Sequence, residues 1–128
     1  MIIIFMFSNQ NGSESSGLSD MIVLFIQKFI NIDKDLLSII VRKGAHMSEY
    51  GLLTLSLIYG FYKNNVIHIY TYSLLITFLY ASFDEFHQLF IAGRAGRPMD
   101  VLIDVCGGII IILIVKGVNY VSDYRKKQ

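Results

Sequence analysis

The chain has 128 residues, of which 54% are hydrophobic and 16% are charged, and its mean hydropathy is +0.54. This composition is too apolar and too lightly charged for a soluble domain of this size, so we expect a single domain in the lipid bilayer of a membrane. The formal net charge of +1 gives no long-range attraction for nucleic acid, and we expect no such partner. The lone Cys106 excludes an internal disulfide.

The N-terminal residues 1–7 are apolar but too short to cross a membrane. A hydrocarbon core of about 30 Å requires about 20 helical residues. The segment also lacks the basic flank and cleavage site of a signal peptide. It is therefore predicted to be the end of a truncated N-terminal span. Residues 8–19 are rich in Ser, Asn and Gly, a composition that predicts a flexible polar loop.

Residues 18–31 show apolar side chains at helical spacing. The apolar positions are Leu18, Met21, Ile22, Phe25, Phe29 and Ile30. Polar residues fall largely on the opposite side, which predicts an amphipathic helix on the membrane surface. Periodicity alone equally allows a helix that packs against the spanning helices.

Three longer segments, residues 36–62, 66–90 and 100–118, are predicted to be spanning helices, which gives an all-α, polytopic transmembrane bundle. The Gly107-Gly108 pair favours close helix packing. If the helices alternate in direction, the turn at Lys63 and the basic residues 125–127 lie at the same end. Basic short segments favour the cytoplasm, so we expect a cytoplasmic C-terminus.

Ionisable residues recur at the opposite end of all three predicted spans. On the first, Arg42, His46 and Glu49 are spaced four and three residues apart and share one face, with Lys43 and Tyr50 on the neighbouring stripe. The polar positions of the second span, the following loop and the third span are Asp84, Glu85, His87, Gln88, Arg94, Arg97, Asp100 and Asp104. Charges at this depth are costly unless they are paired, so this cluster is the candidate functional site.

Several short segments carry a family resemblance. Residues 42–50 (RKGAHMSEY) resemble an RK..H..EY motif, residues 82–88 (SFDEFHQ) resemble S..DE..Q, and residues 7–10 (FSNQ) resemble FSSQ. Gly93-Arg94, followed by Asp100, Asp104 and Gly107, resembles GR....D...N..G. These are motifs of the VanZ family. Asp104 stands where Asn is common, and Ala92 replaces a frequent Pro.

The VanZ resemblance implies an integral membrane protein of the bacterial cell envelope. The founding member of the family is associated with low-level resistance to the glycopeptide teicoplanin. The resemblance implies no known reaction and no known cofactor, so it leaves open whether this chain is an enzyme.

Three interpretations of the cluster follow. In the first interpretation, the cluster is a structural salt-bridge network that fixes the packing of the helices. Alternatively, it binds or modifies an anionic envelope molecule, such as a lipid-linked phosphate or a peptidoglycan-related carboxylate. Arg94 and Arg97 would then hold the anion. His46 or His87 would act as general acid or base, tuned by Glu49 or Asp84.

The third interpretation is a metal-dependent membrane hydrolase. His46-x-x-Glu49 and Asp84-x-x-His87 resemble the paired motifs of di-metal sites in helical bundles. Basic residues crowd the same region and would repel a cation, so the metal interpretation ranks below the other two.

Overall fold

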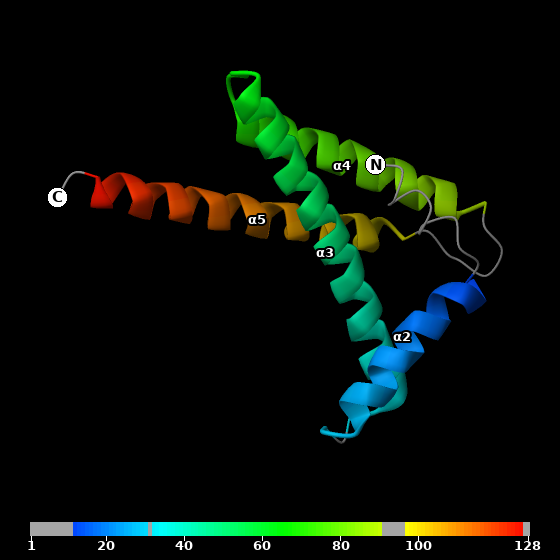
Figure 1. Ribbon diagram of the computed structural model, residues 1–128. Helices are drawn as coiled ribbons and strands as arrows, with labels where there is room; N and C mark the ends of the chain where they lie inside the picture. Colours follow the sequence, from blue (N-terminus) through cyan, green and yellow to red (C-terminus); the bar gives the residue numbers. More distant parts are fainter. Residues whose placement is uncertain (1–11, 31, 91–96, 127–128) are drawn as a thin grey trace.

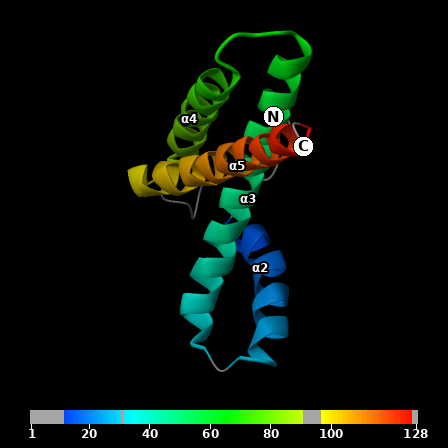
Figure 2. The ribbon, with the colours of Figure 1, turned by 90° about the vertical axis from the view of Figure 1, so that its left-hand side faces the viewer.

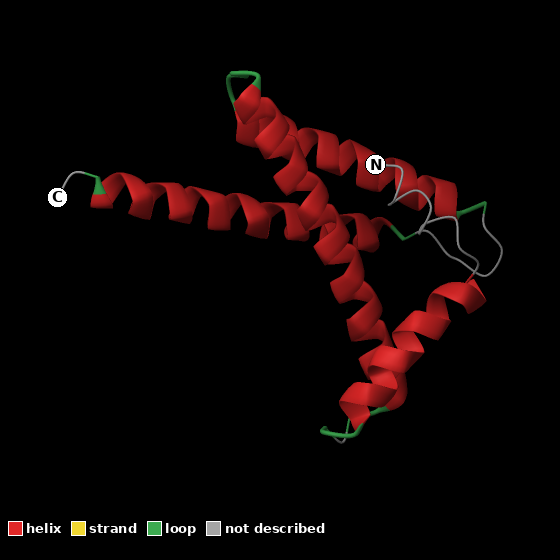
Figure 3. Ribbon diagram, in the orientation of Figure 1, coloured by secondary structure: helices red, strands yellow, loops and turns green. Residues whose placement is uncertain are grey.

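The computed structural model describes residues 12–30, 32–90 and 97–126, and within these ranges all regular secondary structure is helical. Figures 1 and 3 show how the helices of these residues are arranged. They are α2 (Gly12–Gln27), α3 (Lys34–Lys63), α4 (Ile69–Gln88) and α5 (Pro98–Arg125). The all-α class predicted from the sequence is confirmed. The predicted N-terminal span, residues 1–7, lies outside the described residues.

Helix α2 begins at Gly12, so the prediction of a polar loop over residues 8–19 is wrong from that residue onward. Ser and Gly have low helix propensity, but extending an existing helix adds a hydrogen bond for each residue fixed. Helix α2 runs beside α3 (Figure 2), and Val23 is fully buried. Met21 and Phe25 remain 70% and 63% exposed. Helix α2 therefore packs on α3 while most of its predicted apolar stripe stays uncovered.

Helices α4 and α5 run antiparallel, side by side. The start of α4 lies against the C-terminal half of α5, where Asn119 Nδ2 is 3.4 Å from the Tyr70 hydroxyl and Lys116 Nζ is 4.9 Å from the centroid of the Tyr70 ring. Helix α3 crosses α5 at a steep angle in both views (Figures 1 and 2). Contact between α3 and α5 nevertheless extends from the Lys43–Asp100 ion pair to Thr54, which lies against Gly108.

Small residues form this crossing. An ideal Cβ on Gly107 would overlap the main-chain carbonyl of Met47, and one on Gly51 would lie 3.4 Å from the Gly107 carbonyl oxygen. The hydroxyls of Thr54 on α3 and Thr77 on α4 lie 2.8 Å apart in the buried layer next to Gly108. The close approach predicted from the glycine pair is confirmed, because both glycines are buried against neighbouring helices.

Among the described helices, α5 has the length and composition of a membrane span. Its most apolar stretch has a mean hydropathy of 2.5, and only 22% of that stretch is buried. A core helix of a soluble domain would be mostly covered, whereas exposed apolar surface of this kind is typical of membrane or protein interfaces. Helices α3 and α4 each have charged and polar residues at one end. Neither helix has the combination of length and mean hydropathy that is expected of a membrane span. Three full spans are thus not supported by length and hydropathy.

Candidate functional site at the start of helix α5

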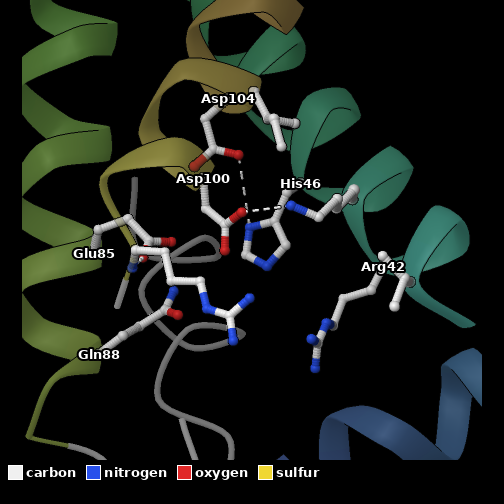
Figure 4. A pocket seen from close by; sticks show the side chains of 10 residues that line it. Arg42, His46, Glu85, Gln88, Asp100 and Asp104 are labelled. Atoms are coloured by element: carbon white, nitrogen blue, oxygen red, sulfur yellow. Dashed lines mark hydrogen bonds and ion pairs between the residues drawn. The ribbon is translucent and has the colours of Figure 1, made fainter. Parts of the chain in front are cut away.

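A cavity of about 350 Å³ lies where α3 passes the end of α4 and the start of α5 (Figure 4). Apart from two isoleucines, its walls consist of ionisable or amide side chains. The lining residues are Ile39, Arg42, Lys43, His46, Glu85, Gln88, Arg97, Asp100, Ile103 and Asp104. The three segments that carried ionisable residues in the sequence therefore do meet at one end of the molecule.

Helical periodicity explains why these residues meet. On α3, the lining positions 39, 42, 43 and 46 recur at spacings of three and four and form one stripe. The last turn of α4 contributes Glu85 and Gln88, and the first two turns of α5 contribute Asp100 and Asp104. Because α4 ends where its antiparallel neighbour α5 begins, these turns face the same part of α3.

The start of α5 is fixed by two contacts with other helices. Arg97 precedes the helix, and its backbone N–H donates a hydrogen bond to Oε2 of Glu85 at 2.8 Å. Pro98 occupies the first turn, where its missing N–H leaves no unsatisfied helix donor. Lys43 Nζ forms an ion pair with Asp100 Oδ1 at 2.6 Å. Glu85, Lys43 and Asp100 therefore hold the cavity walls together.

Asp104 presents the most buried carboxylate of the cavity. The residue is 1% exposed, and neither carboxylate oxygen has a hydrogen-bond partner within residues 12–30, 32–90 and 97–126. His46 Nδ1 lies 3.9 Å from Asp104 Oδ1, which is longer than a hydrogen bond. Figure 4 shows the His46 ring between Asp104 and Arg42. The cavity thus contains a buried acceptor whose hydrogen-bonding capacity the described residues do not use.

Two arginines bring positive charge to the same cavity. Arg42 and Arg97 are both exposed and both line it. In the described part of the chain, neither guanidinium has an ion pair or a hydrogen bond with another side chain. Both remain available to an anion from outside.

Other predicted site residues lie beside the cavity and do not line it. Tyr50 is fully buried and belongs to an apolar cluster. Asp84 is buried and accepts a hydrogen bond from Gln88 Nε2 at 3.2 Å, and both Asp84 and Glu49 interact electrostatically with Asp104. His87 is partly buried on α4. Arg94 lies outside the described residues.

Sequence reasoning placed His87 on the polar face of α4 and Glu85 beside it, whereas Glu85 is the residue that lines the cavity. The spacing of small residues along α4 could have identified Glu85. The small buried residues Ser73, Thr77 and Ala81 are spaced every four positions along α4, and the next step is Glu85. The apolar wall residues Ile39 and Ile103 were missed, although each lies three positions from a predicted site residue.

A metal centre finds no support in this geometry. No group of three or more His, Cys, Asp or Glu side chains could hold a metal ion in the part of the chain that the structure describes. The carboxylates that approach the cavity are instead engaged with Lys43 or the Arg97 backbone, or lie buried at its closed end.

In the residues that the structure describes, fold and site together define a helical protein with one helix apolar enough to cross a membrane and an ionisable cavity at the N-terminal end of that helix. The sequence profile of the VanZ/LLP1 family matches residues 1–119. The chain therefore belongs to the VanZ/LLP1 family, as the motifs indicated. No curated protein and no solved structure matches the chain significantly.

Proposed function

We propose that this chain is a multi-pass protein of the bacterial cell membrane that binds an anionic group of an envelope molecule in the cavity at the start of α5. Apolar side chains that point away from the helix contacts support the multi-pass arrangement. Leu52 on α3, Leu79 on α4 and Leu113 on α5 are 62%, 57% and 63% exposed. Lipid around all three helices would remove this surface from water.

The pair of available guanidinium groups carries the binding proposal. Arg42 and Arg97 line one cavity without using their donors on described carboxylates, although Glu85 and Asp100 lie in the same walls. Guanidinium groups bind phosphate and carboxylate bidentately. Lipid-linked phosphates and peptidoglycan-related carboxylates both have this chemistry. Contribution to glycopeptide resistance through such a molecule is the cellular role that we propose from the family.

His46 is the candidate for proton transfer, because it lines the cavity and its Nδ1 faces Asp104. A neutral or protonated imidazole can serve as base or acid near neutral pH. Binding of the anion does not require this step. His46→Gln therefore separates binding from chemistry: it should leave affinity close to that of the wild type and abolish any turnover.

The alternative is a scaffold whose polar cluster serves only helix packing. The Lys43–Asp100 ion pair and the Arg97–Glu85 hydrogen bond favour it, because both tie together elements far apart in the sequence. A scaffold does not need Arg42, whose guanidinium has no side-chain partner in the described ranges. Arg42 is therefore the position that distinguishes the two functions.

The test uses a strain from which the gene has been deleted, complemented with wild type, Arg42→Gln, Arg97→Gln or the matched control Arg125→Gln at the far end of α5. Teicoplanin susceptibility, pools of lipid-linked precursors and membrane levels of each variant are measured. We expect both cavity variants to accumulate normally and to lose the wild-type phenotype, while Arg125→Gln retains it. Binding of phosphatidic acid in nanodiscs should weaken about tenfold or more in the cavity variants, since a charged hydrogen bond contributes about 1.5–3 kcal/mol. Wild-type behaviour of both cavity variants would overturn the proposal.

A further inference from the structure

We infer that the ligand of this cavity is zwitterionic, with a phosphate or carboxylate at the arginines and a primary ammonium at the Asp104 carboxylate. This inference rests on the proposed function and names the class of its ligand. Ethanolamine phosphate, as a lipid headgroup or as a free molecule, has this chemistry.

Asp104 is a buried carboxylate that needs a hydrogen-bond donor. Burial of a carboxylate is costly unless hydrogen bonds replace its lost water. Asp104 is 1% exposed and both its oxygens lack a hydrogen-bond donor in the described ranges, yet the residue lines an open cavity. A donor that enters the cavity from outside would satisfy this acceptor.

The carboxylates around Asp104 favour an ammonium over a hydroxyl as this donor. Glu85, Asp84, Asp100 and Glu49 all act electrostatically on Asp104, so the closed end of the cavity has a negative field. Lys43 offsets this field at Asp100 on one side. A cationic donor is attracted by Asp104 and by the neighbouring Asp84, whereas a neutral hydroxyl gains only a hydrogen bond.

Negative and positive side chains are separated along the cavity. Asp104 is buried, whereas Arg42 is exposed, and Figure 4 shows them on opposite sides of the His46 ring. A ligand with its positive end inward and its anionic end outward matches both. The cavity volume of about 350 Å³ suits a polar headgroup. A simple anion could bind the arginines, but it has no donor for the Asp104 carboxylate in the same lining.

The experiment compares headgroups on the full-length protein in nanodiscs of phosphatidylglycerol, with retention of added lipid measured by native mass spectrometry. Phosphatidylethanolamine has a phosphate and N–H donors, phosphatidylcholine has the same charges without N–H donors, and phosphatidic acid has only the anion. We expect wild type to retain phosphatidylethanolamine at least about tenfold better than phosphatidylcholine, because a charged hydrogen bond is lost in the latter. Competition by soluble phosphoethanolamine distinguishes headgroup recognition from a requirement for the acyl chains.

Asp104→Asn should abolish the preference for ethanolamine over choline and leave phosphatidic acid binding intact, whereas Asp123→Asn, an exposed carboxylate on the same helix, should change neither. Arg42→Gln should weaken all phosphate-bearing lipids. Equal retention of ethanolamine and choline headgroups by wild type would overturn the zwitterion inference even if Asp104→Asn failed to fold. In that case, continued dependence of phosphatidic acid binding on Arg42 would leave the proposed function standing, and its absence would overturn both.

Discussion

Lys43 Nζ lies 2.6 Å from Oδ1 of Asp100, and this ion pair joins the N-terminal third of α3 to the first turn of α5. The two side chains are 39% and 32% exposed. The pair thus forms part of the cavity wall and remains accessible to the surrounding medium.

Lys43→Ala should lower the free energy of unfolding by less than about 1 kcal/mol, because solvent screens a pair that is this exposed. Reversing one charge, with Lys43→Asp or Asp100→Lys, should also destabilise the protein. Combining the two changes should restore part of the stability that the single reversals lose. The recovery is incomplete because a lysine in the first turn of α5 opposes the helix dipole. Thermal unfolding of the single and double variants in detergent measures the coupling, and strictly additive losses would show that the pair contributes nothing.

The buried hydroxyls of Thr54 and Thr77 form a second link between helices, with 2.8 Å between their Oγ1 atoms. Each Oγ1 also lies 2.9 Å from the carbonyl oxygen four residues earlier. A hydroxyl has one hydrogen, so one threonine donates to the other while its partner donates to its own helix.

We expect Thr54→Val to destabilise the protein by about 0.5–1.5 kcal/mol, in the range of a single hydrogen bond. The double variant, with Thr77→Val as well, should cost less than the sum of the two single changes, because no hydroxyl is left without its partner. The unfolding free energies of wild type, the two single variants and the double variant form a double-mutant cycle that measures this coupling. A double variant that loses the full sum would refute the interhelical bond.

Among the glycines of α3 and α5, Gly107 makes the closest approach to a neighbouring helix, so we expect it to be the most sensitive of them to substitution. Gly107→Ala would drive a methyl group into the Met47 carbonyl and should cost about 1–3 kcal/mol or more through overpacking. Gly117→Ala on the same helix is the matched control, since a Cβ there meets no atom within 4 Å. Gly117→Ala should be neutral or stabilising because alanine favours the helix. Equal melting temperatures for the two variants would contradict the crossing geometry.

The antiparallel pairing of α4 and α5 predicts that the turn after α3 and the C-terminal end of α5 lie on the same side of the membrane. Single cysteines at Asn64, Met99 and Asp123, in a background without Cys106, test this arrangement in intact cells. We expect external reagent to label Met99→Cys and to leave the other two unlabelled. Labelling of Asn64→Cys and Asp123→Cys without Met99→Cys would reverse the orientation. Labelling of only one of Asn64→Cys and Asp123→Cys would show that these two positions lie on different sides of the membrane and would contradict the prediction.

The sequence by itself was sufficient to predict an all-helical fold, the approximate extent of α3, α4 and α5, and the meeting of three polar segments. The physical reason is local. A helix places residues three and four apart on one face whatever its neighbours are, so Arg42 and His46, or Asp100 and Asp104, share a stripe in any such fold.

Tertiary packing decided which polar residues reach the cavity. Glu85 and His87 lie two positions apart on α4, and the rotation of that helix against α3 and α5 places Glu85 in the wall. Ser73, Thr77 and Ala81 set this rotation, because their small side chains allow α4 to pack along that stripe. The steep crossing at Gly107 likewise depends on contact between residues far apart in the sequence. Periodicity within one helix specifies a face, but only the shape of the neighbouring helices specifies where that face points.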